Sequence, residues 1–191
     1  MSKSNFKNRI IRAAMLDSNL YEEVEADKSA QGQAMAIVVL SSIAAGIGLY
    51  KTGGFSGIIT GTMASLISWY VWAYVIYFVG VKLFGGAKTK SNHGELLRTI
   101  GFSSAPGMIR IFGVTPDLMT VTFIGSAFWM LACMVVAVKS ALDYDSMWKS
   151  LGVVIIAWLF IIGLLLWWAY SEGLFDGLLN NTINDKSTEE E

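Results

Sequence analysis

The sequence predicts an all-α integral membrane protein, a bundle of five transmembrane helices with a short N-terminal interfacial helix. The first observation is compositional: 54% of the residues are hydrophobic and 15% are charged, whereas soluble domains carry about 25% charged residues. The second observation is the distribution of charge: no charged residue occurs in stretches 29–50, 52–81, 118–138 and 150–171. A helix of ~20 apolar residues crosses a hydrocarbon layer of ~30 Å, so each stretch is long enough to span.

The fifth segment, 95–114, reads ELLRTIGFSSAPGMIRIFGV. Its uncharged part, 99–109, would measure only ~16 Å as an α-helix. Pro106 lacks a backbone donor and is followed by Gly107, so a short, broken third helix is predicted. Two alternatives remain. A kinked helix spans with Arg98 and Arg110 reaching opposite interfaces, or the segment enters and leaves on one side, shielded by its neighbours.

The distribution of lysine and arginine places the N-terminus in the cytoplasm for either number of crossings. Five crossings put the C-terminus outside and four put it inside. We expect three parts: a cytoplasmic amphipathic and acidic segment 1–32, a membrane-embedded helical bundle 33–175, and a polar disordered tail 176–191. The tail ends in NDKSTEEE, which has too few apolar residues to fold.

The N-terminal segment contains an amphipathic stretch at 5–15. In a helix, Arg9 and Arg12 lie across from an apolar side that is made by Phe6, Ile10, Ala13 and Ala14. Such a helix either lies on the membrane with its basic side chains near anionic headgroups or packs on the bundle. The acidic connector that follows, LDSNLYEEVEADKSAQGQA, is expected to form a short helix before the first span.

Three stretches together resemble the Yip family of Ypt/Rab-interacting membrane proteins, of the bacterial and archaeal type. They are the connector LDSNLYEEVEADKSAQGQA, the central LFGGAKTKSNHGELLRTIGFSSAPGMIRIFGV, and ALDYDSMWKSLGVVIIAWLFIIGLLL. The family's Gly-Tyr-Ser-x-x-Pro-like element corresponds to 101–106, with Phe102 in place of the usual Tyr. The resemblance implies five spans, a cytoplasmic N-terminus and a prokaryotic cytoplasmic membrane. The eukaryotic Asp-Leu-Tyr-Gly-Pro element is missing at 18–22, so GTPase binding is not supported.

The candidate functional residues are Ser103, Ser104, Pro106 and Arg110. Polar groups at membrane depth are costly and often functional, and a proline break frees carbonyls that can line a ligand cavity. The structural alternative, which we favour, is that the two serines satisfy backbone groups near the kink while Arg110 reaches the headgroups.

A second set is expected to pack helices closely: Gly57 and Gly61 in the second span, and Ala44 and Gly48 in the first. Tyr70, Tyr74 and Tyr77 share one helical face, as packing aromatics do. His93 is expected in the loop that precedes the third segment, and Asp143 or Asp145 is expected to end or cap a helix.

No catalytic, cofactor-binding or metal-binding group is recognisable, because nothing resembles a nucleophile–base pair or a ligand cluster. A net charge of −1 does not suit nucleic acid. The expected partners are the lipid bilayer, other membrane proteins or further copies of the chain. The predicted function is a non-enzymatic scaffold or adaptor; the alternative is a small transporter or channel whose site is the broken helix at 103–110.

Overall fold

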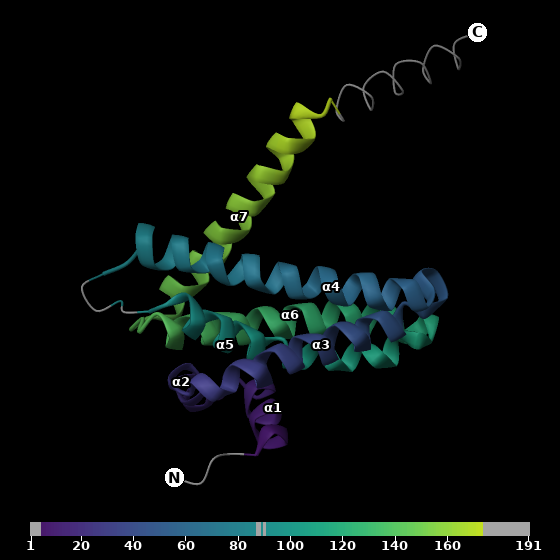
Figure 1. The fold of residues 1–191 in the computed structure, drawn as a ribbon, viewed down its shortest axis with the longest axis horizontal. Coiled ribbons are helices and arrows are strands. Elements are labelled where there is room, and N and C mark those ends of the chain that lie inside the picture. The colour runs from purple at the N-terminus through teal and green to yellow at the C-terminus, as the bar shows by residue number, and fades with distance from the viewer. Residues whose placement is uncertain (1–4, 87–88, 90, 174–191) are drawn as a thin grey trace. The chain divides into compact units, whose positions relative to one another are not determined.

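The computed structural model describes residues 5–86, 89 and 91–173, and within them every regular element is a helix (Figure 1). These residues form two compact units that divide inside the last helix, one up to Val154 and one from Ile155 onward. The predicted polar tail, 176–191, lies outside the described residues.

The N-terminal part of the first unit consists of α1 (Phe6–Ala14), α2 (Ser18–Ala26) and the short 3₁₀ turn η1 (Lys28–Ala30). Helix α1 ends in a Schellman turn, in which Leu16 N–H donates to the Ala13 carbonyl and Asp17 N–H to that of Arg12. Leu16 adopts φ 59° there, a left-handed conformation that usually belongs to glycine. The turn folds α2 back beside α1, and the connector is helical as predicted.

The apolar side of α1 packs on the bundle. Ala13 is fully buried in a core with residues of α2, α3, η3 and α6, and three more apolar side chains of α1 pack against that core: Phe6, Ile10 and Ala14. Of the two placements considered for this helix, the structure therefore has the packed one. Arg9 does not face outward, since it is only 3% exposed, whereas the Arg12 side chain is 27% exposed.

In the described part of the chain, four helices are long and apolar enough to cross a membrane. They are α3 (Gln31–Gly48, with the span counted from Lys28), α4 (Tyr50–Tyr77, continued by the π-helical η2, Phe78–Leu83), α6 (Pro116–Ala141) and α7 (Met147–Ser171). They coincide with the four uncharged stretches, so the chain is an integral membrane protein. The end of α7 carries the exposed aromatic residues Trp167, Trp168 and Tyr170, which are typical of a membrane interface.

The remaining segment between α4 and α6 consists of α5 (His93–Ser103) and the 3₁₀-helical η3 (Ala105–Val114). The chain changes from α to 3₁₀ winding at Ser104, two residues before Pro106. Neither piece counts as a span by length and composition, so the fifth crossing stays a prediction. Within the first unit, α5 and η3 pack between α3 and α6.

Candidate functional site at the polar end of the bundle

Helices α1 and α2 and turn η1, which we call the cap, are held together by the buried side chain of Arg9. Its Nε donates to Glu23 Oε1 and its Nη2 to Asp27 Oδ2, both at 2.9 Å, while Nη1 donates to Gln33 Oε1 at 2.9 Å. A buried guanidinium is stable only when its donors are paired, and here α2, the residue that follows it and α3 supply the acceptors. Hydrogen bonds from Ser29 and then Arg9 lower the pKa of Asp27 to about 2.

Arg12 makes a second, more exposed pair of ionic contacts in the cap. Its Nε lies 2.7 Å from Asp17 Oδ2 and its Nη1 2.7 Å from Glu23 Oε2. The hydrogen bond from Arg12 lowers the pKa of Asp17. Burial raises the pKa of Glu23, but the hydrogen bonds from Arg12 and Arg9 outweigh it and leave this pKa below its usual value. Glu23 therefore bridges both arginines as a carboxylate.

Arg98 of α5 attaches the cap to the bundle. Its side chain is buried, and it donates from Nε to the Val24 carbonyl at 2.9 Å and from Nη2 to the Glu25 carbonyl. Both carbonyls belong to the last turn of α2, where helix carbonyls lack internal partners and the helix dipole favours a positive charge. One of the two alternatives for this segment had Arg98 reaching a membrane interface; in the structure its side chain caps the C-terminal end of α2.

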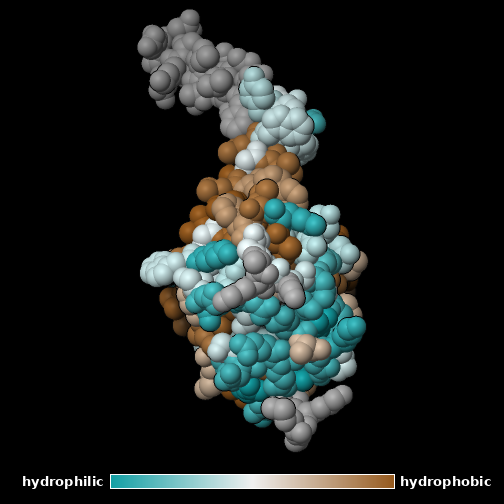
Figure 2. Space-filling model, turned by 90° about the vertical axis from the view of Figure 1, so that its left-hand side faces the viewer, coloured by the Kyte–Doolittle hydropathy of each residue, from teal (hydrophilic) through white to brown (hydrophobic). Residues whose placement is uncertain are grey.

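Carboxylates gather around this junction. Burial, followed by the charges of Glu95 and Asp143, raises the pKa of Glu25 to about 7. Figure 2 looks onto this end of the first unit and shows hydrophilic residues collected there, with hydrophobic surface along the sides. The polar end is the part of the first unit suited to contact water.

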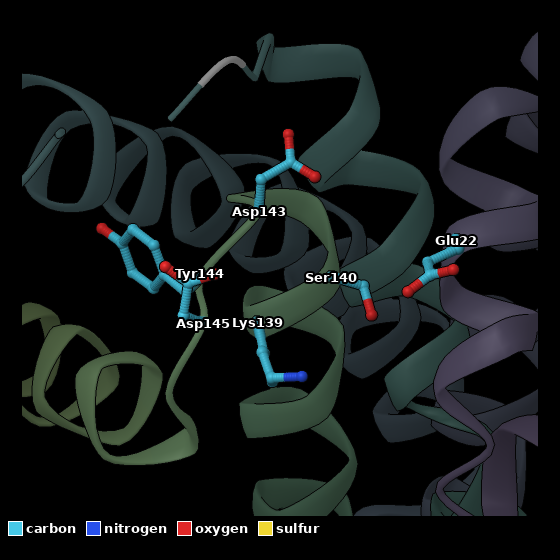
Figure 3. Close-up of a pocket in the computed structure, with 6 residues that line it drawn as sticks. All are labelled: Glu22, Lys139, Ser140, Asp143, Tyr144 and Asp145. Carbon is cyan, nitrogen blue, oxygen red and sulfur yellow. The ribbon is translucent and has the colours of Figure 1, made fainter. Parts of the chain in front are cut away.

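An open pocket of about 420 Å³ lies at this end, beside the turn that joins α6 to α7 (Figure 3). One lining residue comes from α2, and the rest come from the end of α6 and the turn: Glu22, Lys139, Ser140, Asp143, Tyr144 and Asp145. Its chemistry is mixed, because carboxylates, an ammonium group and hydroxyls line the same space.

The turn beside the pocket has a fixed geometry. Asp143 adopts φ 50° in a Schellman turn that ends α6, so this aspartate does end a helix, as the sequence suggested. Tyr144 is buried, and its hydroxyl donates to the Gly80 carbonyl in η2 at 2.7 Å. This hydrogen bond ties the turn after α6 to η2.

The predicted break residues lie in the interior and are occupied by internal contacts. The Ser103 hydroxyl donates to the Ile100 carbonyl at 2.7 Å, Ser104 caps the end of α5, and Pro106 is buried. The Gly107 backbone N–H donates to the Ser104 carbonyl at 3.0 Å, which continues the chain into the 3₁₀ turns. The Ser103 bond is of the kind that the structural alternative expects, and the choice between that alternative and a ligand cavity stays a prediction.

Arg110 does not join the serines. Its Nε donates to the hydroxyl of Ser126, a fully buried residue of α6, at 2.7 Å, and its guanidinium carbon lies 5.5 Å from the centre of the Phe123 ring. Arg110 therefore ties η3 to α6. Its role as a transport residue stays a prediction.

Small residues of α3 approach α5 and η3 closely at three points. A methyl group added at Gly101 would lie 2.7 Å from the methyl carbon of Ala34. One added at Gly107 would lie 2.0 Å from the hydroxyl oxygen of Ser41. At Gly48 it would lie 2.3 Å from the carbonyl oxygen of Arg110. Gly48 thus lies in a tight interface and Ala44 is buried, whereas methyl groups at Gly57 and Gly61 would meet nothing within 4 Å.

His93 is the first residue of α5 rather than part of the loop that precedes it. Asn92 and Glu95 form a capping box that starts the helix there, with Glu95 N–H donating to Asn92 Oδ1 at 3.0 Å. The ring of His93 packs edge-on against Tyr70 and Tyr74, with centroids 4.9 and 5.6 Å away. Burial accordingly lowers the pKa of His93.

Sequence reasoning missed the pairing of Arg9 and the role of Arg98. The signal for Arg9 was present: the basic helix is followed at once by the acidic YEEVEAD, a complement within one hairpin. Nothing local pointed to Arg98, whose acceptors lie more than 70 residues away along the chain. Among the described residues, no group of three His, Cys, Asp or Glu side chains is placed to hold a metal ion.

The comparisons with known proteins agree with this architecture. No curated protein and no solved structure matches the chain. The sequence model of the Yip1 domain matches residues 18–169, which include α2, all four candidate spans nearly to the end of α7, and the α5–η3 segment. Proteins of this family reside in membranes and are not known as enzymes. The chain belongs to the Yip1 domain family.

Proposed function

We propose that this protein is a non-enzymatic membrane scaffold or adaptor that presents its cap and polar end to membrane-protein partners at the cytoplasmic face. The observation that carries the proposal is the rigid attachment of the cap. Arg9 fixes α1, α2 and α3 to one another, and Arg98 fixes the last turn of α2 to α5. A surface assembled from four helices keeps its shape, and preorganised surfaces bind partners at a lower entropic cost.

The charge of the pocket at the polar end supports the same proposal. Glu22, Asp143 and Asp145 are exposed there and outnumber Lys139, the basic residue of the pocket. A surface of one dominant sign selects partners of opposite sign and repels like-charged ones. A basic cytoplasmic segment of another membrane protein is the complement, and such segments are common because positive residues concentrate on that side of the membrane.

We further propose five crossings, with the α5–η3 segment as the third. Positions 34, 41 and 48 of α3 meet positions 101, 107 and 110 in the same order, so the two segments run side by side in the same direction. The 11 residues of α5 rise ~16 Å and the 10 residues of η3 ~20 Å. Together they exceed the ~30 Å of a hydrocarbon core. The N- and C-termini then lie on opposite sides.

Labelling of single cysteines tests this topology. In a Cys133→Ala background, Ser29→Cys, Thr115→Cys and Ser146→Cys are exposed in turn to a membrane-impermeant maleimide. Five crossings predict that positions 29 and 146 react from the cytoplasmic side and position 115 from the other. Labelling of positions 29 and 115 from one side, with 146 on the other, would establish four crossings and refute the proposal.

Affinity purification from native membranes in nanodiscs tests the adaptor function. We expect a stoichiometric membrane-protein partner that is lost from Glu22→Lys and Asp145→Lys variants. Asp117→Lys is the matched control, because it makes the same charge change at the exposed start of α6, the opposite end of that helix. A partner that all three variants retain equally would place its binding site elsewhere. Flux of a solute that Arg110→Ala abolishes, in a chain that still assembles, would favour transport instead.

A further inference from the structure

The end of α1 and the turn that follows it expose three large apolar side chains, which we call the α1 patch. Ile11 is 45% exposed, Met15 72% and Leu16 38%. They do not belong to the side of α1 that packs against the core, which other residues form. Large apolar side chains that gather on an exposed surface mark a contact with a membrane or with another protein.

Two side chains of α6 hold the end of α1 beside the middle of a candidate span. Trp129 Nε1 donates to the Ala14 carbonyl at 2.7 Å, and the Cys133 thiol donates to the Ala13 carbonyl at 3.4 Å. The span comprises Asp117–Ala141, and Trp129 is its middle residue. The end of α1 therefore does not lie beside the end of α6, where water would surround it.

The depth of this contact follows from the length of α6. Its 25-residue span rises ~37 Å, which exceeds a hydrocarbon core of ~30 Å by ~7 Å. Trp129 and Cys133 lie ~18 and ~12 Å from the polar end of the span. Even if the whole excess projects at that end, the two residues remain ~11 and ~5 Å inside the hydrocarbon. Figure 1 shows α1 running across the long helices, as a helix in the plane of a membrane does.

Paired backbone groups suit the end of α1 to surroundings without water. A helix leaves its last four carbonyls without internal partners, and inside a bilayer these carbonyls need protein donors. In α1, three of them accept N–H groups of the following turn, and the fourth accepts the Trp129 indole. The four carbonyls belong to Ile11, Arg12, Ala13 and Ala14.

The charged side chains near the α1 patch are compatible with lipid contact. Arg12 is neutralised by Asp17 and Glu23, each of which lies 2.7 Å away. Lys7 is exposed one helical turn before Ile11. Its long side chain can place the ammonium group among lipid headgroups while its stem runs along the apolar surface.

We infer that α1 lies in the leaflet at the polar end of the bundle and that the α1 patch inserts among the acyl chains of that leaflet. The patch continues the exposed apolar surface of α6, where Phe128 is 71% exposed in the middle of the span. One side of α1 packs on the bundle while another contacts lipid, so the cap is fixed both to the protein and to the bilayer. This inference goes beyond the adaptor function and does not depend on it.

Spin labels measure the depth of the α1 patch in the full chain. In a Cys133→Ala background, Met15→Cys, Phe128→Cys and Ser146→Cys each carry a nitroxide in vesicles of phosphatidylcholine and phosphatidylglycerol. Accessibility to oxygen, which concentrates in hydrocarbon, is compared with accessibility to a water-soluble nickel complex. We expect the label at position 15 to lie about 5–10 Å below the headgroups. It should resemble the label at 128 and differ from that at 146, which is exposed in the turn between α6 and α7.

Photo-crosslinking repeats the measurement on the wild-type chain, without any substitution. A phosphatidylcholine that carries a diazirine in its acyl chain is mixed into the same vesicles and activated by light. We expect lipid adducts within the tryptic peptide 13–28, at Met15 or Leu16, and their positions are determined by mass spectrometry.

Two results would overturn the inference. The first is a label at position 15 that the nickel complex reaches as readily as it reaches position 146, because α1 would then lie in water. The second is a label that neither reagent reaches, together with a wild-type peptide 13–28 that carries no lipid adduct. That outcome would assign the α1 patch to a contact with protein, either a partner or a second copy of the chain.

Discussion

Replacing Arg9 by Met should detach the cap from the bundle. Methionine approximates the aliphatic part of arginine but removes three hydrogen bonds, to Glu23, Asp27 and Gln33. Arg9 is 3% exposed, and breaking a fully buried ion pair costs about 3–5 kcal/mol. The abandoned carboxylates keep 31% and 22% of their side-chain exposure, so water partly replaces the guanidinium. We therefore expect a loss of about 2–3 kcal/mol.

Hydrogen exchange in nanodiscs measures this loss where it occurs. Amides of α1 and α2 exchange through local opening, and a loss of 2–3 kcal/mol accelerates their exchange about 30- to 150-fold. Amides in the middle of α3 and α6 should keep their rates. Lys7→Met is the matched control, since it removes the same charge from an exposed position of the same helix. In a double-mutant cycle, Glu23→Gln should cost less in the Arg9→Met background than in the wild type.

Two results would contradict this role of Arg9: exchange in α1 and α2 of the Arg9→Met variant that is as slow as in the wild type, or equal acceleration of exchange by Lys7→Met. The first result would mean that apolar packing of α1 holds the cap without the ion pairs. The second would mean that the effect is one of net charge. High salt should reproduce neither variant, because buried pairs are screened much less than surface pairs.

Three further changes have signs set by the structure. Gly107→Ala places a methyl group 2.0 Å from the Ser41 hydroxyl and should destabilise the bundle in a thermal assay by about 1–3 kcal/mol, whereas Gly125→Ala, with nothing within 4 Å, should not. Leu16→Gly relieves a left-handed leucine and should slow exchange of α1 by an amount equivalent to about 1 kcal/mol, while Leu16→Ala, which keeps the strain, should not. Glu25 has a pKa of about 7 in the folded protein against 4.5 for the free side chain, so the folded cap binds this proton more tightly than the unfolded chain does. The contribution of Glu25 to the stability of the cap should therefore be fully present below pH 4.5 and should be lost as the pH rises through 7. Glu25→Gln should remove this pH dependence of the stability.

The spans were predictable because a bilayer imposes a rule on composition. An unpaired charge in hydrocarbon is so costly that uncharged stretches of 21 residues or more identify helices without any knowledge of their neighbours. Amphipathicity predicted helix α1 for a similar reason. It could not say what its polar side meets, and Arg9 meets Glu23 rather than headgroups because α2 folds back through the turn at Leu16.

The polar end was less predictable, since its residues come from segments far apart in sequence. Arg98 and its acceptors Val24 and Glu25 belong to α5 and α2, and Glu22 and Ser140 belong to α2 and α6. Each of these residues is ordinary in its own segment. Only the three-dimensional structure shows that these helix ends meet, so that the cap, the carboxylates and the pocket share one surface.

At the interface of α3 with α5 and η3, a packing motif within one segment is weaker evidence of contact than small residues at facing positions of two segments. The pattern Gly57-x-x-x-Gly61 is a recognised packing motif, yet methyl groups at both positions would meet nothing within 4 Å. The close approaches instead join positions 34, 41 and 48 of α3 to 101, 107 and 110. Fourteen residues of α3 rise ~21 Å, and the nine facing residues rise ~17 Å because 3₁₀ turns gain ~2.0 Å per residue. Because the 3₁₀ winding after Ser104 gains more length per residue, the α5–η3 segment follows α3 along most of the length of α3, although its uncharged part is too short to span a membrane as an α-helix. Small residues are needed wherever the backbones of the two segments meet.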